Sequence, residues 1–166
     1  MKFLSPLHTT TFQSPIGAMR MAASEQGLAG VWFEGQKHGP EARTVLSWHP
    51  APQHPLLLQT AQQLGEYFAG QRHTFEIALD LSHGTAFQQS VWQALLTIAC
   101  GQTQSYGDIC QAIGKPKAAR AVGAAVGRNP VSIIVPCHRV VGGNGAMTGY
   151  AGGVDKKIQL LQLEKF

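Results

Sequence analysis

Strand-like hydrophobic patterns dominate the first half of the chain. Residues 18–24 (AMRMAAS) and 28–33 (LAGVWF) are β-prone and are joined by Glu-Gln-Gly, which predicts an antiparallel hairpin. Residues 74–81 (TFEIALDL) alternate apolar and polar positions, which predicts a further strand. Between them, residues 47–55 (SWHPAPQHP) are too rich in proline for regular structure and are predicted to form a loop. The pattern indicates a small antiparallel sheet.

One helix is predicted after that loop. Leu57, Ala61, Leu64 and Phe68 recur at helical spacing, and Gly70 is placed to end the helix. We expect this apolar stripe to face the core.

Helical spacing replaces strand spacing after residues 81–85 (LSHGT). We therefore predict a domain joint there, with domains at 1–84 and 85–166. Thr85 and Gln88 have the spacing of a capping box for the first helix of the second domain. Its apolar face consists of Phe87, Val91, Ala94, Leu95 and Ile98, and Cys100 continues that face as an expected buried small hydrophobe.

Two short helices with a glycine between them follow. Ser105 is a good N-cap, Cys110 lies on the inner face, and Gly114 is placed to end the first helix. Pro116 suits the first turn of a second helix that runs toward Arg128. This pair predicts a helix-turn-helix.

The second of these helices is unusually bare, because most of its residues are alanine or glycine. Major-groove readers generally present longer polar side chains to base edges. Two explanations stay open: close approach of the helix to a ligand, or tight packing of the helix on its neighbour. After it, residues 141–153 form a glycine-rich loop, and Asp155 is expected to cap a last helix that carries Glu164 near its end.

Charge is distributed unevenly along the chain. The net charge is +4, but residues 1–85 carry five Lys/Arg against six Asp/Glu, whereas residues 86–166 carry eight against three. A basic half-chain favours a polyanionic partner, with a solvated charged face as the alternative. No apolar run approaches the roughly 20 residues of a membrane span, and the N-terminus lacks a signal-peptide core, so we expect a cytoplasmic protein without a membrane partner.

Cysteine and histidine usage predicts no metal site. The three cysteines show no CxxC spacing, and the seven histidines are scattered without ligand spacing to them. A disulfide framework is equally unsupported.

Cys137 is the cysteine with an ionisable neighbour, in the stretch IVPCHRVV. Pro136 interrupts a regular strand and favours a bend that presents Cys137 and His138 together. A nucleophilic thiol needs such a base, because an ordinary thiol is mostly protonated at neutral pH. From the residues alone, a nucleophile and a buried inert cysteine are both open.

Several motifs together resemble the O6-alkylguanine-DNA alkyltransferases. PCHRV follows NP, is preceded by SYGDI and PKAARAVGAA, and is followed by GYAGG and a terminal LLQLE. The match is dense over residues 86–166 and looser in the first half, through SPIGAMRMA and GLAGVWF.

The resemblance implies an α+β protein. Its N-terminal part would be ribonuclease H-like, with a small antiparallel sheet plus helix, and its C-terminal part mostly helical and winged-helix-like, with the helix-turn-helix. The implied activity is DNA repair by a methylated-DNA–protein-cysteine methyltransferase. An alkyl group passes irreversibly from O6-alkylguanine, and as a second candidate from O4-alkylthymine, to the protein's own cysteine. The protein would be a monomer without a cofactor, associated with the nucleoid if bacterial.

The resemblance also assigns catalytic roles. Cys137 would accept the alkyl group, His138 would remove the thiol proton through a water, and Glu164 would orient His138. Asn129 would brace the bend, and Tyr106 would rotate the phosphate and donate a hydrogen bond or a proton to guanine N3.

The DNA and pocket residues follow in the same way. In the family the bare helix lies in the minor groove of double-stranded DNA, and Arg120 fills the space of a flipped guanine. Expected DNA-binding residues are Arg120, Tyr106, Ala118, Ala119, Ala121 and Arg128, and expected pocket residues are Val140, Tyr150, Ala151, Ser132 and Thr148. Family members commonly have serine where Ala151 stands, but its role is assigned to the backbone N–H. Some relatives bind zinc in the first domain, and the lack of cysteine before residue 100 predicts a zinc-free chain.

Two rival functions remain at this point. One is a non-catalytic helix-turn-helix protein that binds alkyl lesions and would not need Cys137. The other is a cysteine hydrolase, against which the absence of an oxyanion-hole signature argues.

Overall fold

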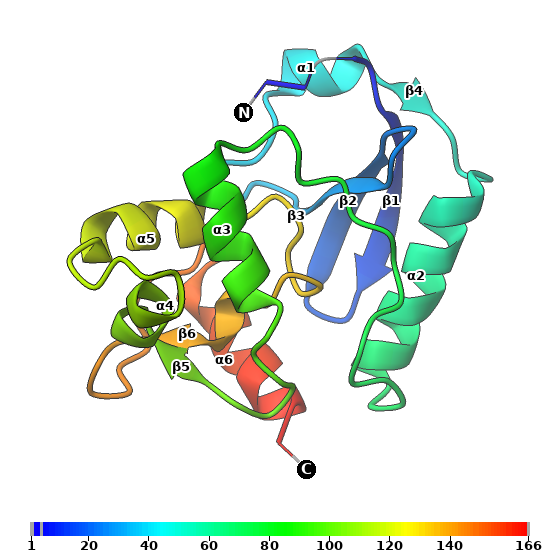
Figure 1. Ribbon diagram of the computed structural model, residues 1–166. Coiled ribbons are helices and arrows are strands. Elements are labelled where there is room, and N and C mark those ends of the chain that lie inside the picture. Colours follow the sequence, from blue (N-terminus) through cyan, green and yellow to red (C-terminus); the bar gives the residue numbers. More distant parts are fainter. Residues whose placement is uncertain (1, 4, 166) are drawn as a thin grey trace.

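The computed structural model describes residues 2–3 and 5–165. Its first half contains a four-stranded sheet in the order β3-β2-β1-β4 (Figure 1). Strands β1 (His8–Ser14), β2 (Gly17–Ala23) and β3 (Leu28–Phe33) are antiparallel neighbours, and the short β4 (His49–Pro50) pairs parallel to β1. The predicted hairpin is confirmed as β2 and β3, whereas β1 was not predicted. The prediction of a loop over residues 47–55 is wrong for His49 and Pro50, because these two residues form β4 and pair with β1.

Helix α2 (Pro55–Phe68) packs beside this sheet (Figure 1). Pro55 occupies the first turn, where its missing N–H costs nothing, and the His54 imidazole accepts a hydrogen bond from the backbone N–H of Leu56. The predicted stop is confirmed, since Gly70 takes a φ of 74° just beyond the helix. A short helix α1 (Ala42–Leu46) precedes β4.

Residues 74–81 do not form the predicted strand. They pair with the sheet only through a bridge between Leu79 and Leu28, although the burial of their side chains does alternate. The reason is that the backbone of Glu76 bonds to side chains of α2: its N–H donates to the Gln63 amide oxygen at 2.9 Å, and its carbonyl accepts from Gln59 at 3.1 Å. In residues 74–81 the alternating hydrophobicity therefore reflects burial of one face of an extended segment, and it does not indicate the regular hydrogen bonds of a β-strand.

The second half is mostly helical. Helix α3 (Ala86–Leu95) begins with the expected capping box of Thr85 and Gln88. It ends before Ile98, and Cys100 is half-buried, so the prediction of a buried Cys100 is wrong because the helix does not carry that residue inward.

The predicted helix-turn-helix is confirmed as α4 (Tyr106–Ala112) and α5 (Ala119–Gly127). Ser105 caps α4 in a capping box with Asp108, and Cys110 is buried as expected. Helix α5 begins at Ala119, so Pro116 lies in the connecting turn and not in the helix. Two short parallel strands, β5 (Gln104–Ser105) and β6 (Val140–Val141), complete this half.

The last helix, α6 (Val154–Leu163), places Glu164 at its C-cap. Its N-cap is Gly153 without a side-chain bond, so Asp155 lies in the first turn and is not the expected cap. One hydrophobic cluster contains residues of the sheet, α2, α3, α5 and α6. The α+β architecture expected from the sequence is thus confirmed.

In the described part of the chain, no helix is long and apolar enough to cross a membrane. The same residues contain no group of three or more His, Cys, Asp or Glu that could hold a metal ion.

Candidate active site and nucleic-acid interface

The PCHR stretch forms a single turn of 3₁₀ helix, η1 (Cys137–Arg139). Pro136 precedes the turn, and the Arg139 N–H donates to the Pro136 carbonyl at 3.0 Å. A turn, unlike a strand, does not send neighbouring side chains to opposite faces. Upstream, Ile133 has a φ of 72°, which is strained for a β-branched residue and is held by the surrounding structure.

Asn129 braces this bend. Its side-chain amide nitrogen donates to the Val135 carbonyl at 2.7 Å and to Cys137 Sγ at 3.1 Å, while its amide oxygen accepts from the Val131 N–H at 2.9 Å. Asn129 is buried, so each of these bonds satisfies a group that water cannot reach. The side chain therefore fixes the position of the sulfur.

Glu164 lies against His138 from the end of α6. His138 Nε2 and Glu164 Oε1 are 2.7 Å apart, and both side chains are almost fully buried. Arg139 donates to both carboxylate oxygens, from Nη2 at 2.8 Å and from Nε at 3.0 Å, and the Tyr67 hydroxyl donates to Oε1 at 2.7 Å. Despite its burial, the pKa of Glu164 lies well below its usual range, because the bonds from His138 and Arg139 stabilise the carboxylate.

The thiol and the imidazole are both neutral at neutral pH. Burial raises the pKa of Cys137 to about 11, opposed by the bond from Asn129 and by the nearby positive charge of Lys157. Burial likewise lowers the pKa of His138, against the raising effect of Glu164. Because a carboxylate only accepts, His138 donates from Nε2, and its buried Nδ1 is left without a hydrogen-bond partner in the described structure. His138 thus keeps an unprotonated ring nitrogen, Nδ1, that can accept a proton.

A cavity of about 200 Å³ opens onto Cys137. Its walls come from α4, α5, the loop before α6 and the loop after β3. They consist of Lys37, His38, Tyr106, Gly123, Val126, Gly127, Cys137, Gly149, Tyr150 and Ala151. The sequence prediction contained Tyr106, Tyr150 and Ala151 but missed Lys37 and His38, which carry no motif and lie in the other half of the chain.

Three expected pocket residues do not line this cavity. Ser132 is buried with its hydroxyl 3.4 Å from the Gln36 side chain, and Thr148 is exposed. Val140 is fully buried, and its carbonyl accepts from Lys157 Nζ at 2.6 Å.

Lys157 is a buried cation that the sequence analysis missed. Its ammonium donates to the carbonyls of Val140, Thr148 and Gly149, at 2.6, 2.7 and 3.2 Å, and its side chain is inaccessible to solvent. The signal was present, because Lys157 stands three and four residues before Leu160 and Leu161 on the inner face of α6.

Helix α5 presents its small residues outward. Val122, Ala125 and Val126 are buried, and Trp92 Nε1 donates to the Ala125 carbonyl at 2.9 Å. By contrast, a Cβ added at Gly123 or Gly127 would meet no atom within 4 Å, so packing inside the protein does not require these glycines. This geometry favours the first explanation of the bare helix, close approach of a ligand.

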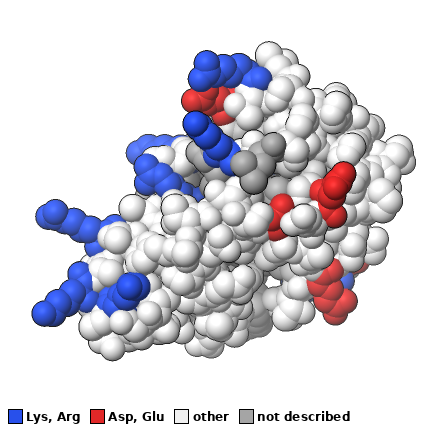
Figure 2. Space-filling model, turned by 45° about the horizontal axis from the view of Figure 1, so that its top comes forward, with Lys and Arg blue, Asp and Glu red and all other residues white. Residues whose placement is uncertain are grey.

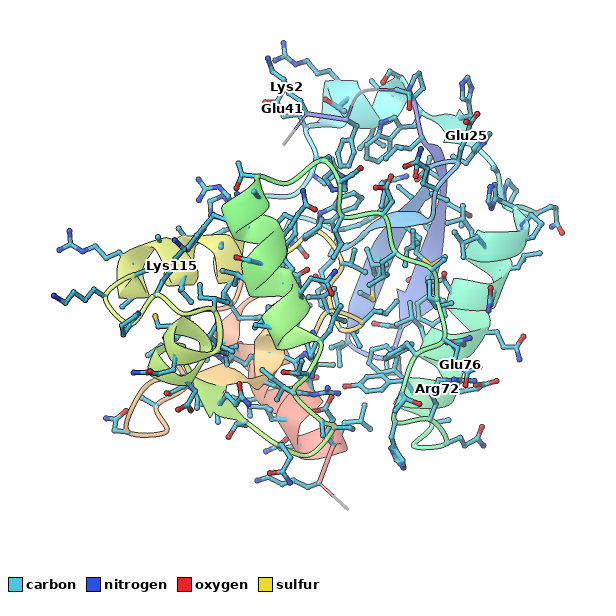
Figure 3. The ribbon with its side chains drawn as sticks, viewed as in Figure 1. Lys2, Glu25, Glu41, Arg72, Glu76 and Lys115 are labelled. Atoms are coloured by element: carbon cyan, nitrogen blue, oxygen red, sulfur yellow. The ribbon has the colours of Figure 1, made fainter. Side chains whose placement is uncertain are left out.

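The expected DNA-binding residues surround that surface. Ala119, Arg120, Ala121 and Arg128 are exposed, and Ala118 is half-buried at the N-cap. Figure 2 shows Lys and Arg side chains gathered on the side of the molecule that carries α4 and α5, and Lys115 extends from this side in Figure 3. Most acidic side chains in the same view lie elsewhere.

Fold and site together define a class: an α+β protein whose helix-turn-helix half holds a cysteine beside a buried histidine–glutamate pair. Two family models match the chain, the ribonuclease-like domain of 6-O-methylguanine DNA methyltransferase over residues 7–81 and its DNA binding domain over residues 86–166. The chain belongs to the 6-O-methylguanine DNA methyltransferase family.

Curated relatives agree. The chain is 48% identical over 159 residues to a methylated-DNA–protein-cysteine methyltransferase of Mycobacterium tuberculosis, covering 96% of this chain and 93% of the relative. It is 46% identical over 158 residues to one of Methanosarcina acetivorans, covering 95% and 98%.

Solved structures give the same result. The crystal structure of the M. tuberculosis O6-methylguanine methyltransferase superposes with a TM-score of 0.86 at 46% identity, covering 96% of this chain and 93% of that one. The M. tuberculosis protein in complex with DNA gives a TM-score of 0.86 at 47% identity, covering 95% and 92%.

Proposed function

We propose that this protein repairs DNA by transferring an alkyl group, typically methyl, from the O6 oxygen of guanine in duplex DNA to Cys137, once per molecule. Family membership supports the reaction class, and the relatives are named for the same transfer. The observation that carries the proposal is the position of Cys137, at a cavity bordered by the exposed face of the helix-turn-helix and next to the buried His138–Glu164 pair. O4-alkylthymine is a second candidate substrate.

The transfer is a single displacement at carbon. The Cys137 proton passes to His138 Nδ1 through a bridging water, and Glu164 stabilises the imidazolium that forms. The sulfur then bonds to the alkyl carbon as the bond from that carbon to O6 breaks. Tyr106, which lines the cavity at the start of α4, donates a proton to guanine N3, so that guanine departs neutral. No cofactor takes part in these steps.

The reaction ends there because the product is a thioether. Unlike the thioester of a cysteine hydrolase, a thioether has no carbonyl for water to attack and no good leaving group.

DNA binds through α5 in the minor groove. The base cannot react inside the stack, so the nucleotide is flipped out, and Arg120 fills the space it leaves. Ala118, Ala119 and Ala121 permit close approach, and Arg128 adds a phosphate contact. Support for this orientation comes from the outward small residues and the basic side chains beside them.

The pocket recognises guanine largely through the backbone. The Cys137 carbonyl receives the exocyclic amine, the Ala151 N–H meets O6, and Tyr150 contacts the base. The expected second acceptor, the Val140 carbonyl, lies outside the cavity walls and would have to become accessible when the base binds. The Val140 carbonyl already accepts from Lys157, but an oxygen with two lone pairs accepts a second bond. Ser132 and Thr148 would act from outside the cavity, as neighbours of its walls.

Residues 85–166 hold the proposed DNA-binding and transfer residues, and residues 1–84 form a structural domain beside them. We place the protein in the cytoplasm as a monomer, where chromosomal DNA is its partner.

A stoichiometric transfer assay tests the proposal. Incubation with duplex DNA containing O6-methylguanine should add one methyl group per protein, found by mass spectrometry on the peptide that contains Cys137. A Cys137→Ala variant should bind the duplex but accept no methyl group. Undiminished repair by this variant in cells would instead support the non-catalytic lesion-binding alternative.

A further inference from the structure

Tyr67 connects the first half of the chain to the proposed catalytic residues. It lies on α2, and its hydroxyl donates to Glu164 Oε1 at 2.7 Å across 97 positions of sequence. The ring is 2% exposed and packs against Phe68 and Phe75, with ring centroids 5.3 and 5.5 Å away. This packing restricts the orientation of the Tyr67 ring and keeps its hydroxyl within hydrogen-bonding distance of the carboxylate.

Three donors share one oxygen of Glu164. Oε1 is approached by His138 Nε2 at 2.7 Å, by Tyr67 Oη at 2.7 Å and by Arg139 Nη2 at 2.8 Å. Each donor withdraws electron density from the carboxylate, so the negative charge that the imidazole meets depends on how many other donors are present. Arg139 is the cationic donor among the three, and Tyr67 is the one donor of the three that comes from the N-terminal half.

We propose that Tyr67 is a positioning residue for alkyl transfer: its hydrogen bond to Glu164 Oε1 competes with the bond from His138 and so limits how strongly the carboxylate stabilises the imidazolium. The reaction itself rests on the function proposed above, but the effect on His138 does not. The N-terminal half thereby takes part in setting the base and is not only a scaffold.

The direction of the effect follows from the charges around His138. Glu164 carries the negative charge next to the ring, and Arg139 compensates it. Besides the adjacent Cys137, the titratable and charged groups that interact with His138 or Glu164 are Arg139, Lys157, Tyr67, Tyr150 and Cys100. Removing the Tyr67 hydroxyl changes none of these charges, so the carboxylate meets one donor fewer and imidazolium becomes easier to form.

Helix α2 contains a matched control. Thr60 is fully buried, and its hydroxyl donates to the Leu56 carbonyl at 2.8 Å within the helix. A Thr60→Val variant thus removes a buried hydroxyl from the same element without touching Glu164. Tyr67→Phe removes only one hydroxyl and leaves Oε1 with two donors, so no buried acceptor is orphaned.

The experiment measures the rate of methyl transfer against pH for native protein, Tyr67→Phe and Thr60→Val. Transfer requires neutral His138, so the rate falls on the acid side as the imidazole protonates. For Tyr67→Phe we expect this acid limb to move to higher pH by about 0.5 to 1 unit, while Thr60→Val overlays the native profile. If the acid limb of the Tyr67→Phe profile stays at the native pH and only the maximal rate changes, Tyr67 has a structural role only and the proposal is overturned.

Two further measurements keep the test decisive. Placing 3-fluorotyrosine at position 67 makes the phenol a stronger donor, so the acid limb should move to lower pH, the opposite direction. An NMR titration of the His138 ring in unreacted protein should show the same two shifts. Because that titration needs no alkyl transfer, unchanged His138 titration refutes this inference even if the protein is active, and a protein that transfers no methyl group refutes only the proposed function.

Discussion

Glu164→Gln removes the centre of a buried cluster and should destabilise the fold strongly. The carboxylate accepts four hydrogen bonds, two from Arg139, one from His138 and one from Tyr67, at 2.7 to 3.0 Å, and is 1% exposed. Glutamine keeps one oxygen but loses the charge, leaving the buried Arg139 without a counter-ion. Breaking a buried ion pair from one side costs about 3–5 kcal/mol, against a total stability of about 5–15 kcal/mol.

Glu66→Gln is the matched control. Glu66 also accepts from an arginine, Arg72 Nε at 2.6 Å, but this pair is partly solvent-exposed. Exposed pairs are screened and contribute little, so the same chemical change should leave the urea midpoint close to native. Urea unfolding followed by circular dichroism measures both variants, and equal midpoints for Glu164→Gln and Glu66→Gln would refute the reasoning from burial.

The pH dependence of the Glu164→Gln effect has a defined sign. The folded pKa of Glu164 lies below its unfolded value of about 4.3, so its stabilisation is present above that pH and is lost as pH falls toward the folded pKa. The gap between native protein and Glu164→Gln should therefore be constant above about pH 5.5 and shrink in more acid solution. A gap that widens with acid would contradict the assignment of an ionised Glu164.

Three other predictions concern Arg120, Cys137 and Lys157. Arg120→Ala should slow repair of duplex DNA about tenfold or more while leaving reaction with free O6-benzylguanine nearly unchanged, because the free base needs no flipping; equal losses on both would remove that role. Iodoacetamide should label Cys137 in unreacted protein about 100-fold more slowly at neutral pH than an ordinary thiol of pKa 9.0, since its pKa is raised to about 11. Rapid labelling at neutral pH would show that the thiolate is already formed. Lys157→Met should lower the free energy of unfolding by about 3 kcal/mol, because the buried Val140 carbonyl and the partly buried carbonyls of Thr148 and Gly149 lose a charged donor. A native-like midpoint in thermal melts would count against this.

Local signals in the sequence predicted the helices better than the sheet. The Thr85 and Ser105 capping boxes and the apolar stripe of α2 act within one element, so α2, α3 and α4 were found. Strand β1 was missed because its residues 8–14 are mostly polar and only their pairing with β2 makes them a strand. Residues 74–81 show the converse, since their burial alternates while their backbone bonds go to helix side chains.

The residues of the candidate site likewise divide into those that a local motif marks and those that only long-range packing brings to the site. Cys137 and His138 lie in one motif, and Glu164 entered through the resemblance, because 26 residues separate it from the histidine that it contacts. Nothing local in the sequence marks Tyr67 or His38, since both reach the site only when the two halves pack. Lys157 was predictable from its place on the inner face of α6, but a lone lysine in an amphipathic helix is usually solvated.

The electrostatics of the site fit a protein that reacts once. A permanently ionised thiolate would be open to oxidation and to alkylation by small molecules, whereas burial keeps Cys137 protonated. Burial lowers the pKa of His138 against the opposing effect of Glu164, and Arg139 adds to the lowering, so His138 also stays neutral and able to accept a proton. In the proposed mechanism, thiolate formation therefore depends on proton transfer within the occupied cavity, where the alkyl carbon is the available electrophile. We infer that burial keeps Cys137 and His138 as a neutral pair and not as a preformed nucleophile, while Arg139 and Tyr67 limit the opposing effect of Glu164.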